Sequence, residues 1–325
     1  APTMRKRTLT AALAMTLAGG AAHADEGMWM PLQLPQLAAQ LKAAGFAGDP
    51  AQLADVTKPP LAAVVSLGGC TASFVSPEGL VVTNHHCAMG AIQLNSTPEK
   101  NLIQDGFIAA TRADEVSAGP ASRIWVTVGF DKITDRILAG AKGKTGRAYY
   151  DAVDAAKKTA VAECEADAGH RCSVADMYYG SDFYLIKQLE LKDIRLVYAP
   201  PRAIGNYGDE IDNFMWPRHT GDFTFYRAYV GKDGKPAAYS KDNVPYAPPA
   251  HLTVSTAPVK AGDFAMVAGY PGRTFRHRTA SEFAGQIAWL LPTRVAMYDG
   301  LIRTVEQATA GDKAKEVRYA SAVAG

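Results

Sequence analysis

The sequence predicts a mainly β fold with inserted helices. First, residues 69–87 contain two runs of β-forming residues on either side of a Pro-Glu-Gly turn, which is typical of a β-hairpin. Second, further β-rich runs recur at residues 123–130, 183–199 and 223–230. Third, apolar residues at helical spacing are concentrated in residues 131–168 and from Ser281 onward. A hydrophobic content of 48% supports a sizeable core.

The first 24 residues have the pattern of a secretory signal peptide. A basic run at residues 4–7 precedes a short apolar run at residues 9–17, and Ala22-His23-Ala24 fits a small-x-small cleavage site. The apolar run is too short to cross a bilayer. We therefore expect a mature start at Asp25 and a periplasmic or secreted protein.

Other elements follow from local patterns along the chain. Leu34, Leu37 and Leu41 predict an N-terminal helix, with Pro35 in its first turn and Gly45 at its end. Residues 88–118 are expected to connect the hairpin to the next strand, with helical character near residues 101–110. The remaining expectations are helices over 131–168 broken at 142–146, strands at 251–254 and 264–268, and helices from about residue 281 to the end.

The four cysteines form two pairs that are close in the sequence. In an exported protein, Cys70 with Cys87 and Cys164 with Cys172 suggest two local disulfides, although four cysteines allow three pairings. The first pair would close the hairpin.

A zinc site at His85, His86 and Cys87 is the competing interpretation of the same stretch. Adjacent residues on a strand point to opposite faces, so a single metal ion would not easily bind all three. We predict no metal and no cofactor.

Charge gives no indication of a nucleic-acid partner. The formal net charge is +2, from 34 basic and 32 acidic residues, and no basic block stands out. Nucleic-acid binding is therefore not expected.

His86 is the candidate general base. It lies where a strand-turn-strand unit ends, beside a cysteine that could be bonded back to the first strand, so that a reactive imidazole can be held in place. A satisfied histidine beside a disulfide is the structural alternative. The neighbouring His85 is expected to be structural or solvent-facing.

Asp222 is the candidate partner of that base, because a hydrolytic imidazole needs a carboxylate to orient it. Asp222 follows a glycine and opens the β-rich run at residues 223–230, within a polar and aromatic stretch. Asp209, Glu210 and Asp212 compete for the role, and a plain turn aspartate remains open for Asp222. Arg218 and His219 are expected to brace this stretch, and Trp216 to be a core or cleft-wall aromatic.

A nucleophile is missing from these patterns. No serine lies in a Gly-x-Ser-x-Gly or an Asn/Asp-Ser-Gly context. The sequence therefore predicts a base and a carboxylate without a serine, which is half of a catalytic site.

Two long motifs resemble the bacterial dipeptidyl-peptidase 7 and 11 family of serine exopeptidases. The first is Gly-Cys-Thr-Ala-Ser-Phe-Val-Ser at residues 69–76 with Asn-His-His-Cys at residues 84–87. The second is Asp-Asn-Phe-Met-Trp-Pro-Arg-His-Thr-Gly-Asp-Phe at residues 212–223. Glu-Gly-Met-Trp at residues 26–29 and Gly-Tyr-Pro-Gly-Arg-Thr at residues 269–274 also match, so the likeness covers the whole mature part.

The resemblance implies a chymotrypsin-like double β-barrel, incomplete here, followed by the start of an α-helical domain. It divides the chain into a signal peptide at residues 1–24, part of the catalytic domain at residues 25–275 and a truncated helical domain at residues 276–325. It also implies a homodimer of the full-length protein.

The same resemblance implies roles for site residues. His86 would be the general base and Asp222 its orienting carboxylate. Asn213 would bind the free α-amino group of the substrate, and Phe214, at a position where some relatives have Trp, would line that end of the cleft. The serine would lie beyond residue 325.

We therefore expect a serine-type dipeptidyl aminopeptidase that releases dipeptides from peptides with a free N-terminus, with the 325-residue chain inactive by itself. The alternative is a secreted trypsin-like binding module without catalysis. The sequence gives no preference at the second substrate residue.

Overall fold

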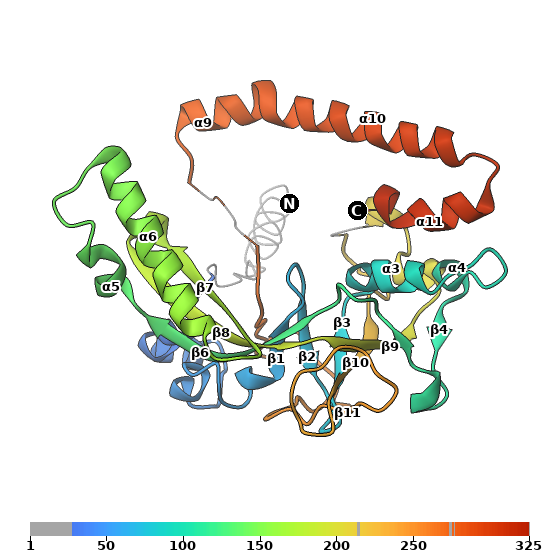
Figure 1. Ribbon diagram of the computed structural model, residues 1–325, viewed down its shortest axis with the longest axis horizontal. Coiled ribbons are helices and arrows are strands. Elements are labelled where there is room, and N and C mark those ends of the chain that lie inside the picture. Colours follow the sequence, from blue (N-terminus) through green and yellow to red (C-terminus); the bar gives the residue numbers. More distant parts are fainter. Residues whose placement is uncertain (1–27, 213–214, 273–274, 276, 325) are drawn as a thin grey trace, which may run out of the picture.

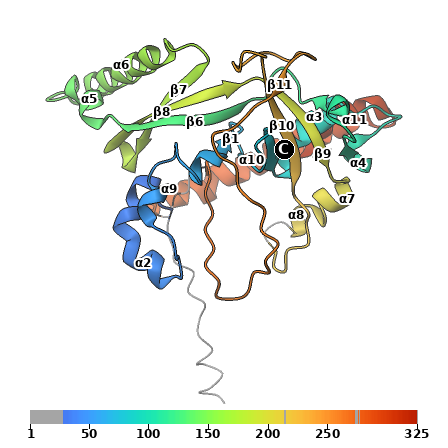
Figure 2. The ribbon, with the colours of Figure 1, turned by 90° about the horizontal axis from the view of Figure 1, so that it is seen from below.

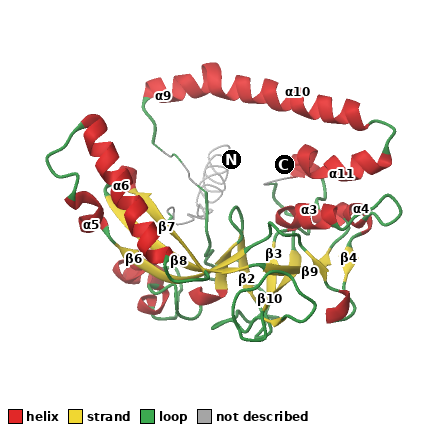
Figure 3. Cartoon of the chain, viewed as in Figure 1, coloured by secondary structure: helices red, strands yellow, loops and turns green. Residues whose placement is uncertain are grey.

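A large antiparallel sheet runs through the molecule, with helices above it (Figures 1 and 3). The computed structural model describes residues 28–212, 215–272, 275 and 277–324. The predicted signal peptide and the predicted substrate-binding residues Asn213 and Phe214 lie outside the described residues. The expected combination of a β-sheet with helices is present, but more of the described residues are helical than lie in strands, so the expectation of a mainly β chain is wrong. The double barrel stays a prediction.

The sheet has eleven strands in the order β4-β9-β10-β3-β2-β1-β6-β8-β7, and β5 and β11 pair with β9 and β10. All of the strand pairs are antiparallel, as expected for hairpins and meanders. The strands are β1 Val64–Ser66, β2 Thr71–Phe74, β3 Leu80–Thr83, β4 Phe107–Ile108, β5 Val116–Ser117, β6 Ile124–Lys132, β7 His170–Met177, β8 Asp182–Leu191, β9 Asp193–Ala199, β10 Thr224–Val230 and β11 Val244–Pro245.

The helices are mostly short, apart from two long ones. The 3₁₀ helices are η1 Pro31–Leu37, η2 Pro50–Leu53, η3 Leu61–Ala63, η4 Arg112–Asp114 and η5 Tyr178–Gly180, and η6 Gln286–Leu290 is a π-helix. The α-helices are α2 Ala38–Ala43, α3 His85–Leu94, α4 Leu102–Asp105, α5 Thr134–Ala139, α6 Gly146–Glu165, α7 Arg202–Gly205, α8 Asp209–Asp212, α9 Ala280–Gly285, α10 Leu291–Thr309 and α11 Lys313–Ala324.

The predicted hairpin is present as β2 and β3. Ser73 pairs with Val82 and Phe74 with Val81. In the turn between them Gly79 has a φ of +69°, which is easy for glycine and uncommon for other residues. The sequence thus identified this unit correctly.

Helix α3 follows the hairpin directly, and the sequence did not predict it. His86 therefore lies in the first turn of a helix and not at the end of a strand, which corrects our expectation. Ala88 and Ile92, one turn apart, are fully buried in the main core with Phe74 and Val81 of the hairpin. Burying each large aliphatic side chain contributes about 1.5–3 kcal/mol, so packing on the sheet favours a helix here.

Two expected strands are wrong. Among the described residues between β11 and α9 no strand forms, although residues 251–254 and 264–268 are rich in β-forming side chains. Leu252 donates one backbone hydrogen bond to Phe74, but Val267 is 99% exposed. Strand propensity needs a partner strand, and these segments have none among the described residues.

The predicted C-terminal helices cross above the sheet as α9, η6 and α10, and α11 then turns back toward α3 (Figure 1). The side chain of Gln93, near the end of α3, accepts a hydrogen bond from the backbone N–H of Ser321 at 2.8 Å and donates to the carbonyl of Arg318. Helix α11 therefore contacts the element that carries His86. Whether they begin a separate domain stays a prediction.

None of the described helices is both long enough and apolar enough to span a membrane.

Candidate active site

A disulfide fixes the first turn of α3 against the hairpin. Cys70, immediately before β2, is bonded to Cys87, the third residue of α3. The second suggested pair, Cys164 with Cys172, is also joined and ties α6 to β7. Both pairings suggested by the spacing are present.

Sheet register brings Asp222 to the same place. Strand β10 pairs with β3, and Thr224 lies opposite Thr83. Asp222, two positions before Thr224, therefore lies beside the residues that follow Thr83, because the two strands are antiparallel. Asn84 confirms this closeness, because its side-chain amide donates to the backbone oxygen and to Oδ2 of Asp222, both at 3.2 Å.

Asp222 contacts His86 through both carboxylate oxygens. Oδ1 accepts the backbone N–H of His86 at 3.0 Å, and Oδ2 lies 2.8 Å from the ring Nδ1. The N-cap residue Asn84 makes no side-chain cap, so the carboxylate of Asp222 satisfies an N–H of the first helical turn that the helix itself leaves free. The same group thus caps the helix and orients the ring.

The two side chains differ in exposure. The side chain of Asp222 is 14% exposed and that of His86 is 69% exposed. With Nδ1 directed at the carboxylate, Nε2 of His86 is the nitrogen left to exchange protons with a reacting group. This is the geometry of a carboxylate-oriented general base.

Electrostatics favour an ionised Asp222. Partial burial by itself raises the pKa of this carboxyl. The hydrogen bonds from the backbone N–H and the ring of His86, the charge of that ring when protonated and the bond from Asn84 outweigh it, so the pKa of Asp222 lies below its usual range. The group is therefore a carboxylate at neutral pH.

Asp209, one competing carboxylate, has a different set of partners. It accepts from Arg202 at 3.3 Å and from the amide of Asn206 at 2.6 Å. The side chains of Glu210 and Asp212 lie outside what the structure describes. Among the described side chains of the candidate carboxylates, Asp222 is therefore the one that contacts His86.

Every serine of the sequence falls within the described residues, and none of their hydroxyl groups hydrogen-bonds the ring of His86 in that part of the chain. Several have local roles. Ser76 accepts from Glu78 and Leu80 in the hairpin turn, and Ser96 donates to Ile92 at the end of α3. The described part therefore contains a histidine paired with a carboxylate, and no serine is paired with that histidine.

The loop that leads to Asp222 carries exposed apolar side chains. Trp216 is 88% exposed, so it is not the core aromatic that we considered. Met215 and Tyr207 are also exposed, and the ring of His219 lies edge-on to Tyr207, in line with the bracing role expected for His219. Met215 and Trp216 directly follow Asn213 and Phe214 in the sequence. The aromatic content of the stretch was the one sequence signal for these exposed groups.

The zinc interpretation loses its ligands. Cys70, His86 and Cys87 place possible ligand atoms within 4.8 Å of one another, but both sulfurs are used in the disulfide. Cysteine binds a metal ion as a thiolate, which a disulfide does not offer. His85, His86 and Cys87 lie on a helix and not on a strand, so our expectation that adjacent residues here point to opposite faces of a strand is wrong.

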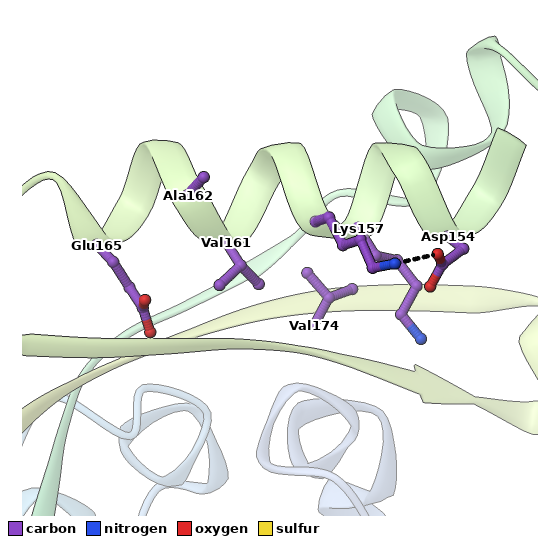
Figure 4. A pocket seen from close by; sticks show the side chains of 7 residues that line it. Asp154, Lys157, Val161, Ala162, Glu165 and Val174 are labelled. Carbon is purple, nitrogen blue, oxygen red and sulfur yellow. Dashed lines mark ion pairs between the residues drawn. The ribbon is translucent and has the colours of Figure 1, made fainter. Parts of the chain in front are cut away.

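A separate hollow lies between α6 and β7 (Figure 4). Val161, Ala162 and Val174 line its apolar part, and Asp154 pairs with Lys158 at its rim. No serine, histidine or cysteine lines it. It has no histidine oriented by a carboxylate, so the His86–Asp222 pair remains the candidate active site.

The pair has the geometry of an imidazole oriented by a carboxylate, an arrangement that recurs in peptidase triads. Comparison with known families identifies the family: the family model of Peptidase S46 matches residues 24–325. The chain therefore belongs to the peptidase S46 family, and the dipeptidyl-peptidase resemblance is confirmed.

Named relatives agree with this assignment. An Asp/Glu-specific dipeptidyl-peptidase of Shewanella putrefaciens is 46% identical over 310 residues, covering 95% of this chain and 42% of that protein. Dipeptidyl-peptidase 7 of Porphyromonas gingivalis is 36% identical over 321 residues, covering 97% of this chain and 45% of that protein. The chain thus spans less than half the length of these relatives.

Solved structures show the same architecture. The crystal structure of Porphyromonas endodontalis DPP11 in complex with the dipeptide Arg-Glu superimposes with a TM-score of 0.83 at 32% identity. The match covers 93% of this chain and 44% of that one. The large antiparallel sheet with its helices is therefore an architecture shared with DPP11.

Proposed function

We propose that the full-length protein is a serine-type dipeptidyl aminopeptidase in which His86 is the general base and Asp222 its orienting carboxylate. The observation that carries this proposal is the two-point contact of Asp222 with the backbone and the ring of His86. Membership of a dipeptidyl-peptidase family supports the reaction class.

In this mechanism Nε2 of His86 takes the proton of a serine hydroxyl as the serine attacks the peptide carbonyl. The same nitrogen then gives the proton to the leaving amine. Asp222 keeps Nδ1 protonated and stabilises the imidazolium that forms. The carboxylate remains ionised throughout because its hydrogen bonds hold its pKa low.

The serine is proposed to lie in a part of the protein outside these 325 residues, together with the oxyanion hole. Two observations support this. No serine hydroxyl in the described part bonds the ring of His86, and the relatives are more than twice as long as the matched region. The 325-residue chain alone should then be inactive, and the second barrel would be completed by that missing part.

Substrate length is proposed to be measured from the amino end. Asn213 would hydrogen-bond the free α-amino group, with Phe214 beside it. Blocking that amine leaves polar groups of such a site unpaired, which can cost 10⁴-fold or more in discrimination. Exposed Met215 and Trp216 next to these positions fit a loop that contacts ligand.

We further propose a preference for Asp or Glu at the second substrate residue. The Asp/Glu-specific dipeptidyl-peptidase of Shewanella putrefaciens is 46% identical, which is what supports this preference. Three other proteins of that name are 36–38% identical, and the dipeptidyl-peptidase 7 proteins are 34–36% identical. Export to the periplasm or beyond and a homodimeric full-length protein complete the proposal, and two disulfides suit an oxidising compartment.

The test uses the full-length protein and a panel of fluorogenic dipeptides, Xaa-Asp, Xaa-Glu, Xaa-Leu and Xaa-Phe, each with a free or an acetylated amino end. We expect release only from free amines, fastest with Asp or Glu. His86→Ala should abolish release while the melting temperature stays near that of the wild type. Retained activity in that variant contradicts the mechanism, and hydrolysis of acetylated substrates contradicts the amino-end role.

A further inference from the structure

His85 is a buried histidine with no role in the mechanism above. Its side chain is 1% exposed, and neither Nδ1 nor Nε2 has a hydrogen-bond partner among the described residues. An imidazole in that setting is more costly to bury than an apolar ring. Its position next to the candidate base therefore calls for an explanation.

Helix α7 covers the ring. A Cβ placed on Gly205 would lie 2.6 Å from both Cγ and Nδ1 of His85 and 2.8 Å from Cδ2, distances that real contacts do not show. Gly205 is buried and its φ is not in the left-handed region, so space is the reason that glycine fits here. The backbone of α7 thus rests directly on the imidazole.

Helix α7 in turn holds the segment that carries Asp222. The carbonyl of Ile204 accepts the backbone N–H of Gly221 at 2.9 Å. Figure 2 shows α7 and α8 following β9, on the way to β10. His85 contacts Gly205 of α7, and the neighbouring Ile204 is bonded to Gly221. Asp222, the next residue, contacts His86, so these contacts form a closed path that begins and ends in the first turn of α3.

We propose that His85 is a positioning residue for the His86–Asp222 pair. Its imidazole fixes the distance between the first turn of α3 and α7. Because Ile204 of α7 is bonded to Gly221, this distance also determines the position of the Asp222 carboxylate. This deepens the proposed function and rests on it. In this role the imidazole of His85 is uncharged and acts through its volume.

The surroundings keep the ring neutral. Burial lowers the pKa of His85, and the nearby positive charges of His86 and Arg202 lower it further, while Asp222 works in the opposite direction. A neutral ring does not compete with His86 for the negative charge of Asp222. The carboxylate then serves one imidazole only.

Steric substitution tests this positioning role without removing a catalytic group. Gly205→Ala should push the ring of His85, displace α7 and lower kcat for dipeptide release by the full-length enzyme about 100-fold, the loss typical of an ångström-scale misplacement. Gly90→Ala is the matched control, because it lies in the same helix α3 as His85 and its added Cβ meets no atom within 4 Å. That variant should keep wild-type kcat and KM.

A compensating variant separates positioning from simple misfolding. His85→Ala opens the space that the methyl group added by Gly205→Ala needs. The double variant His85→Ala/Gly205→Ala should therefore recover kcat about tenfold relative to Gly205→Ala alone, the size of coupling expected between touching residues. Equal or lower kcat in the double variant overturns the proposal.

A chemical readout works without catalysis. Diethyl pyrocarbonate acylates accessible, unprotonated imidazoles, and fragment-ion mass spectrometry distinguishes His85 from His86. In the wild type we expect His86 to react and His85 to be protected. In Gly205→Ala, His85 should react, and the pH dependence of His86 acylation should shift because Asp222 has moved.

The outcomes distinguish the two proposals. If the wild type releases no dipeptide, the proposed function fails, and the acylation experiment still decides the role of His85. If Gly205→Ala matches Gly90→Ala in kcat and in His86 acylation, the positioning role is wrong.

Discussion

Asp222 holds His86 at two atoms of the same residue, the backbone N–H at 3.0 Å and the ring Nδ1 at 2.8 Å. One carboxylate therefore fixes both the helix that carries the imidazole and the rotation of the imidazole itself. A displacement of Asp222 would therefore remove the helix cap and the ring contact together.

Asp222→Asn separates these two tasks. The amide oxygen can still accept the backbone N–H of His86, but the side chain no longer stabilises an imidazolium. We expect folding to be retained and kcat of the full-length enzyme to fall about 10⁴-fold, as for the corresponding change in a serine peptidase triad. Asp131→Asn, at an exposed position of β6, is the control and should leave kcat unchanged. A loss below tenfold in Asp222→Asn argues against the orienting role.

Acid should weaken the first turn of α3. The folded-state pKa of Asp222 lies below its value in the unfolded chain, which is about 3.9. The stabilisation is therefore complete above that pH and is lost as the pH falls through the lower, folded-state pKa. Urea unfolding between pH 6 and pH 2.5 should show a smaller decline in Asp222→Asn than in the wild type. Identical pH profiles would contradict the low pKa.

Removal of either disulfide should lower the free energy of unfolding by a similar amount, but only removal of Cys70–Cys87 should lower kcat. Each closes a short loop, of 17 and 8 residues in sequence separation, and removing either should cost roughly 3 kcal/mol by the chain-entropy estimate. Cys70→Ser/Cys87→Ser frees the turn that carries His86, so kcat should fall as well. Cys164→Ser/Cys172→Ser is the matched control, with kcat preserved in the folded fraction. Thermal melts and initial rates on the same samples decide the matter.

The buried ion pair between Glu115 and Arg227 of β10 gives a stability prediction. Glu115 accepts from Nε of Arg227 at 2.8 Å and from the hydroxyl of Tyr229 at 2.6 Å, and it is nearly inaccessible to solvent. Glu115→Gln leaves the guanidinium of Arg227 without its counter-charge, so we expect a loss of about 3 kcal/mol in the free energy of unfolding.

The comparison for that change is the exposed pair Arg147–Asp151 on α6. Asp151→Asn should cost less than about 0.5 kcal/mol, because solvent screens exposed ion pairs. Urea denaturation of both variants gives the two values, and similar losses would mean that burial does not strengthen the Glu115 pair.

Much of the fold was predictable because its signals are local. The hairpin, the β6 and β8 runs and helix α6 each carry their own pattern of turn residues and periodicity. Helix α3 was not predicted, because it begins at His85, two residues after β3 ends, and no glycine or proline marks the boundary between strand and helix. Residues 251–254 and 264–268 have strand propensity, but pairing depends on a partner that no local pattern reveals.

The site divides in the same way. His86 and Asp222 could be paired from motifs, and the structure brings them together, while their catalytic roles stay a proposal. The burial of His85 was not predictable, because it depends on Gly205 resting on the ring from a distant part of the chain. Asn213 and Phe214 stay predictions, since they lie outside the described residues.

Helix α3 carries His86 near its first residue and Gln93 near its last, about 10 Å further along at the usual rise per residue. Gln93 is bonded to the backbone of α11, at both Arg318 and Ser321. Helix α3 therefore carries the candidate base at its first turn and is bonded to α11 at its last turn. A displacement of α11 relative to the sheet would therefore act on the same helix that sets the orientation of the His86 imidazole.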